Sequence, residues 1–236
     1  KTNAKNSTVD YIAMQFRLFK NLGITAGFLP YSTVGYNMSR TSTVPNSEDK
    51  YGQTTLKLEN YSGEGGIQQI FIGLGYEVIK NLSIGANLSY LYGDISHSAT
   101  NTFSNENASI SSWTEKLSVN DYKLDLGIQY TRQFGEKHAV TLGAVYSPGH
   151  DLNSKGYKYN ETYSSSSVIL SQKIDTINNA CDLPTSWGIG ATYNYNKKLT
   201  VGIDYTMQKW EDAKFPTSSQ NGQFTSQEGQ FCNRSK

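Results

Sequence analysis

Apolar and polar residues alternate with period two along several segments of the chain. Between residues 68 and 78 the even positions include Ile70 and Leu74, while the odd positions include Gly73 and Gly75. A period of two places successive side chains on opposite faces of an extended strand. The segment is therefore predicted to be a β-strand with one apolar face.

The same pattern recurs in pairs of segments joined by short polar turns. The predicted hairpins are residues 10–31, 67–94, 122–147 and 186–208, and they recur about every 55 to 60 residues. Their tight turns lie at one end of the strands, and long Ser/Thr/Asn-rich loops are predicted at the other end, at 41–65, 95–121, 147–183 and 211–236. Short turns on one side and long loops on the other are typical of bacterial outer-membrane barrels.

Composition supports a membrane wall made of strands. No run of about 18 apolar residues occurs, which excludes a transmembrane helix, and the mean hydropathy is −0.54. Barrel strands need an apolar residue only at every second position, so their overall hydropathy is low. The polar face is mostly Gly, Ser, Asn and Gln, whereas a soluble sandwich or lipocalin-like barrel would favour Lys, Glu and Thr there. We therefore predict an all-β, antiparallel transmembrane β-barrel of the bacterial outer membrane.

The order of turns predicts that this chain is an internal piece of a larger barrel. Single-chain bacterial barrels normally have both ends on the periplasmic side, but here the first connection is the tight turn at 20–23. Both ends of the chain then lie on the long-loop side. Residues 1–236 are expected to form one barrel segment of about eight strands.

Three strings carry a resemblance to a known family. They are YIAMQFRLFKNLGITAGFLPYSTVGYN (11–37), GEGGIQQIFIGLGYEVIKNLSIGANLSYLYGD (63–94) and LPTSWGIGATY (183–193). They resemble Bacteroidetes members of the FadL/TodX outer-membrane transport family. The resemblance implies a 14-stranded barrel with an N-terminal hatch, of which this chain supplies the second to ninth strands. It also implies passive transport of long-chain fatty acids or other hydrophobic small molecules, without a cofactor.

One proline lies inside a predicted wall strand. Pro30 cannot donate a ladder hydrogen bond, and Gly27 and Gly35 flank it. A bulge or break at this point would open a gap in the wall, and the resemblance implies a lateral exit in the third strand. Gly27, Pro30 and Gly35 are thus candidates for a lateral opening. The alternative is that Pro30 only ends the regular strand near the outer interface.

Two sets of inward residues suggest different contents for the lumen. Apolar or aromatic candidates for a hydrophobic ligand path are Leu29, Tyr31, Leu91 and Val145. Charged candidates, which suggest instead a diffusion porin or contacts with a hatch, are Arg17, Glu77, Lys123, Asp125 and Asp204. A third alternative is a structural barrel subunit of an outer-membrane protein complex, with polar loops such as GYKYNETYSSSS as docking surfaces. Expected partners are therefore a hydrophobic ligand, outer-membrane lipid and lipopolysaccharide, and a larger membrane complex.

The two cysteines occupy equivalent places in the predicted topology. Cys181 and Cys232 each precede a strand that returns from the outer side, which suggests a disulfide between outer loops. Free thiols are the alternative. Their spacing does not form a metal motif.

The histidines provide little support for an enzyme. His97 and His150 have Asp94 and Asp151 nearby in sequence, while His138 borders a tight turn. No Gly-framed nucleophile accompanies them, so we interpret them as ordinary loop residues with no catalytic role. The formal net charge of +1 gives no reason to expect a nucleic-acid partner.

Overall fold

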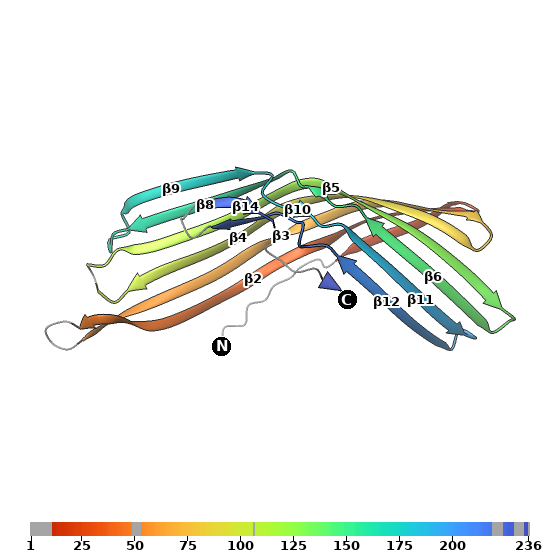
Figure 1. Ribbon diagram of the computed structural model, residues 1–236, viewed down its shortest axis with the longest axis horizontal. Coiled ribbons are helices and arrows are strands. Elements are labelled where there is room, and N and C mark those ends of the chain that lie inside the picture. Colours follow the sequence, from red (N-terminus) through yellow and green to blue (C-terminus); the bar gives the residue numbers. More distant parts are fainter. Residues whose placement is uncertain (1–10, 49–52, 106, 219–223, 229–233, 236) are drawn as a thin grey trace.

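The computed structural model describes residues 11–48, 53–105, 107–218, 224–228 and 234–235, and Figure 1 shows them as one curved antiparallel sheet with small additions. Neighbouring strands in the main path are β1 (Ile12–Phe19), β2 (Leu22–Glu48), β3 (Thr54–Ile79), β4 (Leu82–Phe103), β5 (Ile110–Phe134), β6 (His138–Ser147), β11 (Ser186–Tyr195), β12 (Leu199–Gln208) and β15 (Arg234–Ser235). The first eight of these strands are the wall strands, and their order matches the predicted succession of hairpins.

Tight turns join the wall strands in pairs at one end of the sheet, on the right in Figure 1. Asn81 has a φ of 75°, Gly135 of 62° and Asn196 of 48°. Tight hairpin turns of two or three residues use such left-handed conformations, which Gly and Asn adopt most readily. The predicted tight turns are therefore confirmed.

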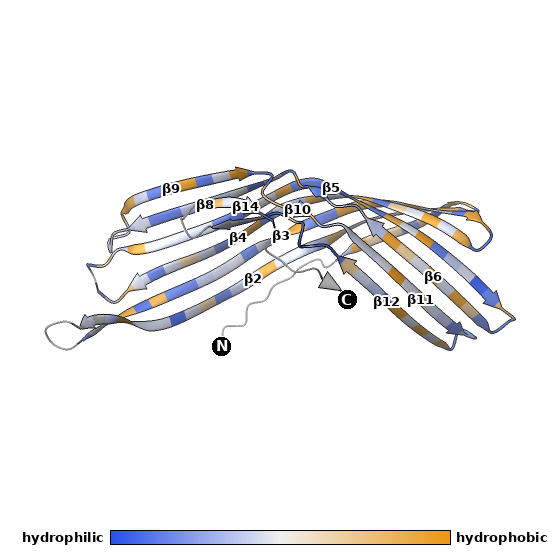
Figure 2. Ribbon diagram, in the orientation of Figure 1, coloured by the Kyte–Doolittle hydropathy of each residue, from blue (hydrophilic) through white to orange (hydrophobic). Residues whose placement is uncertain are grey.

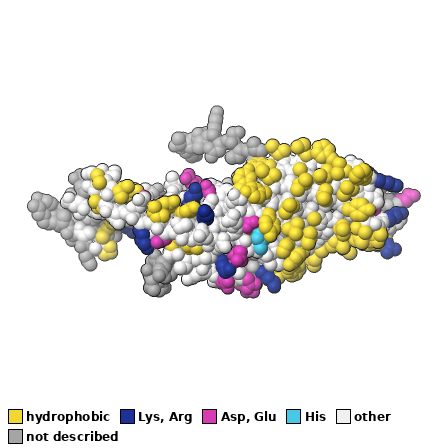
Figure 3. All heavy atoms as spheres, turned by 90° about the horizontal axis from the view of Figure 1, so that it is seen from above, with side chains coloured by type: hydrophobic (Ala, Val, Ile, Leu, Met, Phe, Trp, Pro, Cys, Tyr) yellow, Lys and Arg dark blue, Asp and Glu magenta, His cyan; other side chains and the backbone are white. Residues whose placement is uncertain are grey.

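Apolar side chains cover the part of the wall next to these turns. Figure 3 shows hydrophobic side chains gathered over that half, with Lys and Arg at its extreme end, and Figure 2 shows the alternation along β6, β11 and β12. Large exposed members of this band include Ile72, Leu74, Ile84, Leu88, Leu126, Ile128, Leu142, Ile189, Val201 and Ile203. Along β4 the band runs from Leu82 to Tyr90, which spans about 26 Å of strand and fits the apolar height of an outer-membrane barrel.

Aromatic residues mark the two edges of this band. At the outer edge Tyr90 pairs with Tyr122 and Tyr146 pairs with Trp187. Tyr130 and Tyr193 lie nearer the tight turns. Such aromatic girdles occupy the two membrane interfaces of barrels.

The predicted loops at 41–65 and 95–121 are wrong, because most of these residues continue the strands. The β2–β3 ladder runs from the pair Leu22 and Tyr76 to the pair Glu48 and Thr54, and β4 pairs with β5 as far as Asn101 and Ser111. Beyond the hydrocarbon layer a strand meets water on its surfaces and needs no apolar face. The polar composition therefore concealed strands rather than indicating loops. We call the parts of β2 to β5 beyond the outer aromatic row the outer sheet.

The predicted loop at 147–183 also contains ordered strands. β8 (Ser154–Tyr163) pairs with the outer half of β5, and β9 (Ile169–Asn178) pairs with β8. The inner half of the same β5 edge pairs with β6. Two short ladders complete the structure, β7 (His150–Asp151) with β10 (Asp182–Leu183) and β13 (Phe215–Ser218) with β14 (Phe224–Gln227). No helix in the described part of the chain is long and apolar enough to cross a membrane.

Candidate functional site: the lumen wall and its outer cap

The inward face of the wall forms a shallow hollow at the level of the membrane. Its volume is about 560 Å³. The residues of the polar face that line it are mainly small and uncharged: Gly75, Ser83, Gly85, Gly127, Gln129, Thr141, Gly143, Gly188, Gly190, Thr192, Gly202 and Thr206. Predicted candidates Val145 and Asp204 also line this hollow.

The predicted charged residues do not gather into one ring. Arg17 donates to the backbone oxygen of Lys20 at 3.1 Å, and the Glu77 carboxylate accepts from the backbone nitrogen of Asn81 at 3.0 Å. Both therefore fasten tight turns. Lys123 and Asp125 form an ion pair near the opposite, outer end of the wall.

Ser147 also donates to the Asp125 carboxylate, so this inward charge is locally compensated. A selectivity ring would need charges at one height that face the pore. The porin interpretation therefore receives no support from these contacts.

Just beyond the outer aromatic row, a cap packs against the inward face of the wall. We define the cap as residues 148–153, 180–185 and 209–214. From the wall come Ile67, Leu91 and Val119, and from the cap come Leu152, Cys181 and Leu183; these six form one buried apolar cluster, the cap core. Leu91 is fully buried and Val119 is 2% exposed. The predicted ligand-lining residue Leu91 is thus inward, but it is covered by the protein itself.

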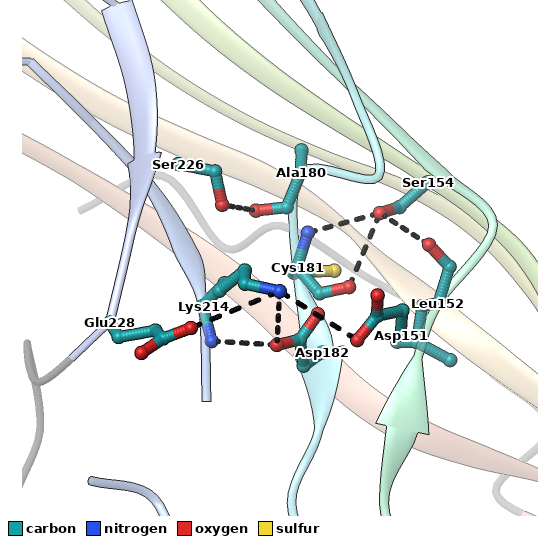
Figure 4. Close-up of polar contacts among 9 residues, drawn as sticks. All are labelled: Asp151, Leu152, Ser154, Ala180, Cys181, Asp182, Lys214, Ser226 and Glu228. Atoms are coloured by element: carbon teal, nitrogen blue, oxygen red, sulfur yellow. Dashed lines mark hydrogen bonds and ion pairs between the residues drawn. The ribbon is translucent and has the colours of Figure 1, made fainter. Parts of the chain in front are cut away.

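Polar contacts hold the three segments of the cap together (Figure 4). The Ser154 hydroxyl donates to the Leu152 carbonyl and accepts from the backbone nitrogen of Cys181, both at 3.1 Å. The backbone nitrogen of Asp182 donates to the Lys214 carbonyl, and the backbone nitrogen of Lys214 donates to the Asp182 carboxylate, again at 3.1 Å. These contacts connect β10 to the segment that follows β12.

A lysine lies among three carboxylates in the cap. Lys214 Nζ is 3.8 Å from Asp151 and 3.9 Å from both Asp182 and Glu228. Burial raises the pKa of the Asp182 carboxyl, while Lys214 acts in the opposite direction. The described residues contain no group of three or more His, Cys, Asp or Glu side chains placed to hold a metal ion.

The region of Pro30 forms a bulge rather than a break on its β3 side. Leu29 pairs with Gln69 and Pro30 with Gln68, after which the register shifts so that Ser32 pairs with Ile67. Tyr31 is the extra residue of this bulge. The β2–β3 ladder then continues through Gly35, so this seam is closed.

On the other edge of β2, the described pairing with β1 ends at Phe28 and Ile12. Residues 1–10 lie outside the described residues. A lateral opening at Gly27, Pro30 and Gly35 therefore stays a prediction for the β1 side alone.

The predicted disulfide stays a prediction. Cys181 is a buried thiol that forms no disulfide with any described residue, and Cys232 lies outside them. Burial raises the pKa of the Cys181 thiol. The predicted place of Cys181 before a returning strand is confirmed, but its position in the cap core was not predicted.

The histidines contact other groups than the predicted aspartates. The ring nitrogen Nδ1 of His97 lies 2.9 Å from the Tyr36 hydroxyl, and Asp94 binds Lys116 at 2.8 Å. His150 stacks on Tyr122 with a centroid distance of 4.6 Å.

His138 Nδ1 lies 2.6 Å from the Tyr193 hydroxyl at the tight-turn end of the wall. Asp151 contacts Lys214. His150 Nε2 lies 3.8 Å from the Asp121 carboxylate instead, so neither histidine contacts the aspartate that is near it in the sequence.

The apolar outer band, the aromatic girdles and the small-residue lumen face define an outer-membrane β-barrel protein. Residues 1–231 match the family model BamG, an outer-membrane β-barrel family. The chain belongs to the BamG family. None of the curated proteins matches its sequence.

A solved structure shows the same fold at low sequence identity. The toluene transporter TbuX of Ralstonia pickettii aligns with a TM-score of 0.58 and 12% identity over 95% of this chain. The chain spans 62% of the length of TbuX. CarO of Acinetobacter baumannii aligns with 11% identity over 67% of this chain and 76% of CarO, but its TM-score of 0.25 supports no argument. The resemblance to FadL/TodX is thus supported as a shared outer-membrane barrel fold, and not as membership of that family.

Proposed function

We propose that this chain belongs to a structural barrel subunit of an outer-membrane protein complex. The observation that carries the proposal is the cap core. Inward apolar residues at the outer end of the lumen, with Leu91 and Val119 the most deeply buried, pack against Leu152 and Leu183 of the same chain. Apolar surface that a transporter would offer to a hydrophobic ligand is here used for internal packing.

The outer sheet supports the same proposal. From Leu91 to the end of β4 at Phe103, the strand extends about 40 Å beyond the aromatic row. Neighbouring strands pair along nearly this whole length. A paired sheet of this length forms an ordered platform on the cell-surface side, as a docking surface requires. The family name BamG also suggests association with an outer-membrane complex.

Quantitative co-purification tests this proposal. The full-length protein would be tagged in its native outer membrane, solubilised in mild detergent and purified, with the protein subunits quantified by mass spectrometry. We expect at least one partner in a fixed ratio that persists through a second purification step. Recovery of the protein alone, with only substoichiometric and variable companions, would refute the proposal.

A second candidate is passive transport of hydrophobic small molecules. The fold similarity to the toluene transporter TbuX and the bulge at Tyr31 favour it. In this candidate the full protein is a larger, FadL-like barrel of 14 strands, and long-chain fatty acids or similar compounds leave through the β1 side of Pro30. Liposomes carrying the full-length protein or its Pro30→Val variant would be tested for uptake of a fluorescent fatty acid, with ion conductance as a control. Saturable uptake lost in the variant, without ion flux, would support transport.

A further inference from the structure

The strand β9 forms an edge of the sheet on the cell-surface side. It comprises Ile169–Asn178, and β8 is the only strand that pairs with it among the described residues. An edge strand presents a row of unpaired backbone N–H and C=O groups. These backbone groups of β9 are therefore suited to pair with another extended polypeptide.

Exposed apolar side chains lie beside these backbone groups, at the start of β9 and in its middle. Val168, Ile169, Leu170 and Ile174 are each more than half exposed, at 59%, 55%, 58% and 53%. Because Ile169 and Leu170 are consecutive, they lie on opposite faces of the strand. A strand added at this edge would bury apolar surface on both faces.

Features that usually protect an edge strand are weak here. Natural edges are commonly blocked by lysines, prolines or a covering segment. β9 has no proline, and its single lysine, Lys173, is paired with Asp175 at 3.0 Å.

The nearby β13–β14 hairpin contacts β9 through β14, but it forms no ladder with β9 among the described residues. Ser218 donates to Glu115 of β5 at 2.9 Å, and Phe224 lies over Gly156 of β8.

We propose that β9 binds an extended strand of a partner protein by β-sheet augmentation. This inference rests on the proposed function and names the surface of the complex that is used. The partner segment would carry apolar residues opposite 168–170 and polar residues opposite Lys173 and Asp175. Main-chain hydrogen bonds supply the affinity in this mode, and alternate side chains supply specificity.

A second copy of this chain fits the edge less well than a foreign strand. Two copies inserted in the same membrane are related by a rotation about the membrane normal. That rotation leaves their β9 strands running in the same direction. Self-pairing would therefore be parallel, which is the less stable ladder, whereas a partner strand is free to pair antiparallel.

Site-specific photo-crosslinking tests the proposal in the native membrane. A benzophenone side chain would be placed in the full-length protein at Gln172 in β9 and, as a matched control, at Asn105 in the exposed turn between β4 and β5. We expect crosslinks from position 172 to one extended segment of a different protein, and none to that segment from position 105. Ile174→Lys should lower the yield from position 172 about tenfold, because it replaces a buried apolar contact by a charge. Ile174→Val should retain the yield.

Three results would overturn the proposal. These are crosslinks from position 172 to a second copy of this chain, crosslinks to another segment of the same polypeptide, and the absence of a protein crosslink. If the complex co-purifies intact while position 172 gives no crosslink, the inference about β9 fails and the proposed function stands. If no complex is recovered, the proposed function itself fails.

Discussion

The cap core makes a measurable prediction, because Cys181 reports on whether the cap is closed. Its thiol is 3% exposed within the core, and burial raises its pKa. Alkylation at neutral pH therefore requires the cap to open, and its rate follows the population of the open state. The perturbation is Leu91→Ala, since Leu91 is fully buried against the cap.

Removing a buried leucine side chain costs about 2 to 5 kcal/mol. Leu91 keeps its neighbours in the wall when the cap opens, so we take the lower end, about 2 kcal/mol, for the loss in cap closure. Because 1.4 kcal/mol corresponds to a factor of about ten, alkylation should accelerate about thirtyfold.

The assay measures maleimide modification of Cys181 in a Cys232→Ser background by intact-mass spectrometry. Leu88→Ala is the matched control, because Leu88 lies on the same strand but faces outward and is 52% exposed. Its modification rate should match the wild-type rate. An unchanged rate in Leu91→Ala, or an equal increase in Leu88→Ala, would refute the interpretation of this cluster as the contact that holds the cap on the wall.

Three further predictions concern the cap and the outer sheet. Lys214→Met should increase Cys181 alkylation by up to about fivefold, since the ion pairs of this partly exposed lysine contribute up to about 1 kcal/mol. Lys209→Met should leave the rate unchanged, and equal rates in both variants would contradict the role of the carboxylate cluster. Gly65→Ala should lower the free energy of unfolding by about 1 to 3 kcal/mol, because Gly65 has a φ of +99° and an added Cβ would meet the Asp94 carbonyl. Gly35 has open space around it, so Gly35→Ala should leave the free energy of unfolding unchanged in denaturant titrations. A hydrogen bond from Lys116 lowers the pKa of Asp94, so this contact stabilises the outer sheet above the ordinary aspartate pKa and is lost as the pH falls through the lowered value. In Lys116→Met the Asp94 pKa should return upward in an NMR titration, and no shift would contradict the pairing.

The membrane part of the fold was predictable because lipid imposes a strict pattern. Each wall strand must present an apolar residue at every second position, as Ile70, Ile72 and Leu74 do, and must turn tightly at Asn81. The outer sheet lies beyond the membrane, so its strands need no apolar residue at every second position. Its strands meet water, so Thr41 and Thr100 read as loop residues although they lie in ladders.

The cap could not be predicted for a different reason. Its short ladder pairs Asp151 with Asp182, and two-residue strands carry no detectable period. The available signal was the presence of isolated apolar residues, Leu152 and Leu183, within long polar segments. Such residues indicate that a loop packs on something, but not on which surface. As a result, Leu91 was predicted to face inward but its burial by the cap was not foreseen.

We propose that this barrel wall belongs to a subunit of an outer-membrane complex and not to a solitary transporter. The most direct test is the mass of the particle that carries the full-length protein after gentle solubilisation of native outer membranes, measured by mass photometry. We predict one dominant mass that exceeds the protein in its detergent micelle by the mass of at least one further protein. A single population at the mass of the isolated protein would contradict the claim.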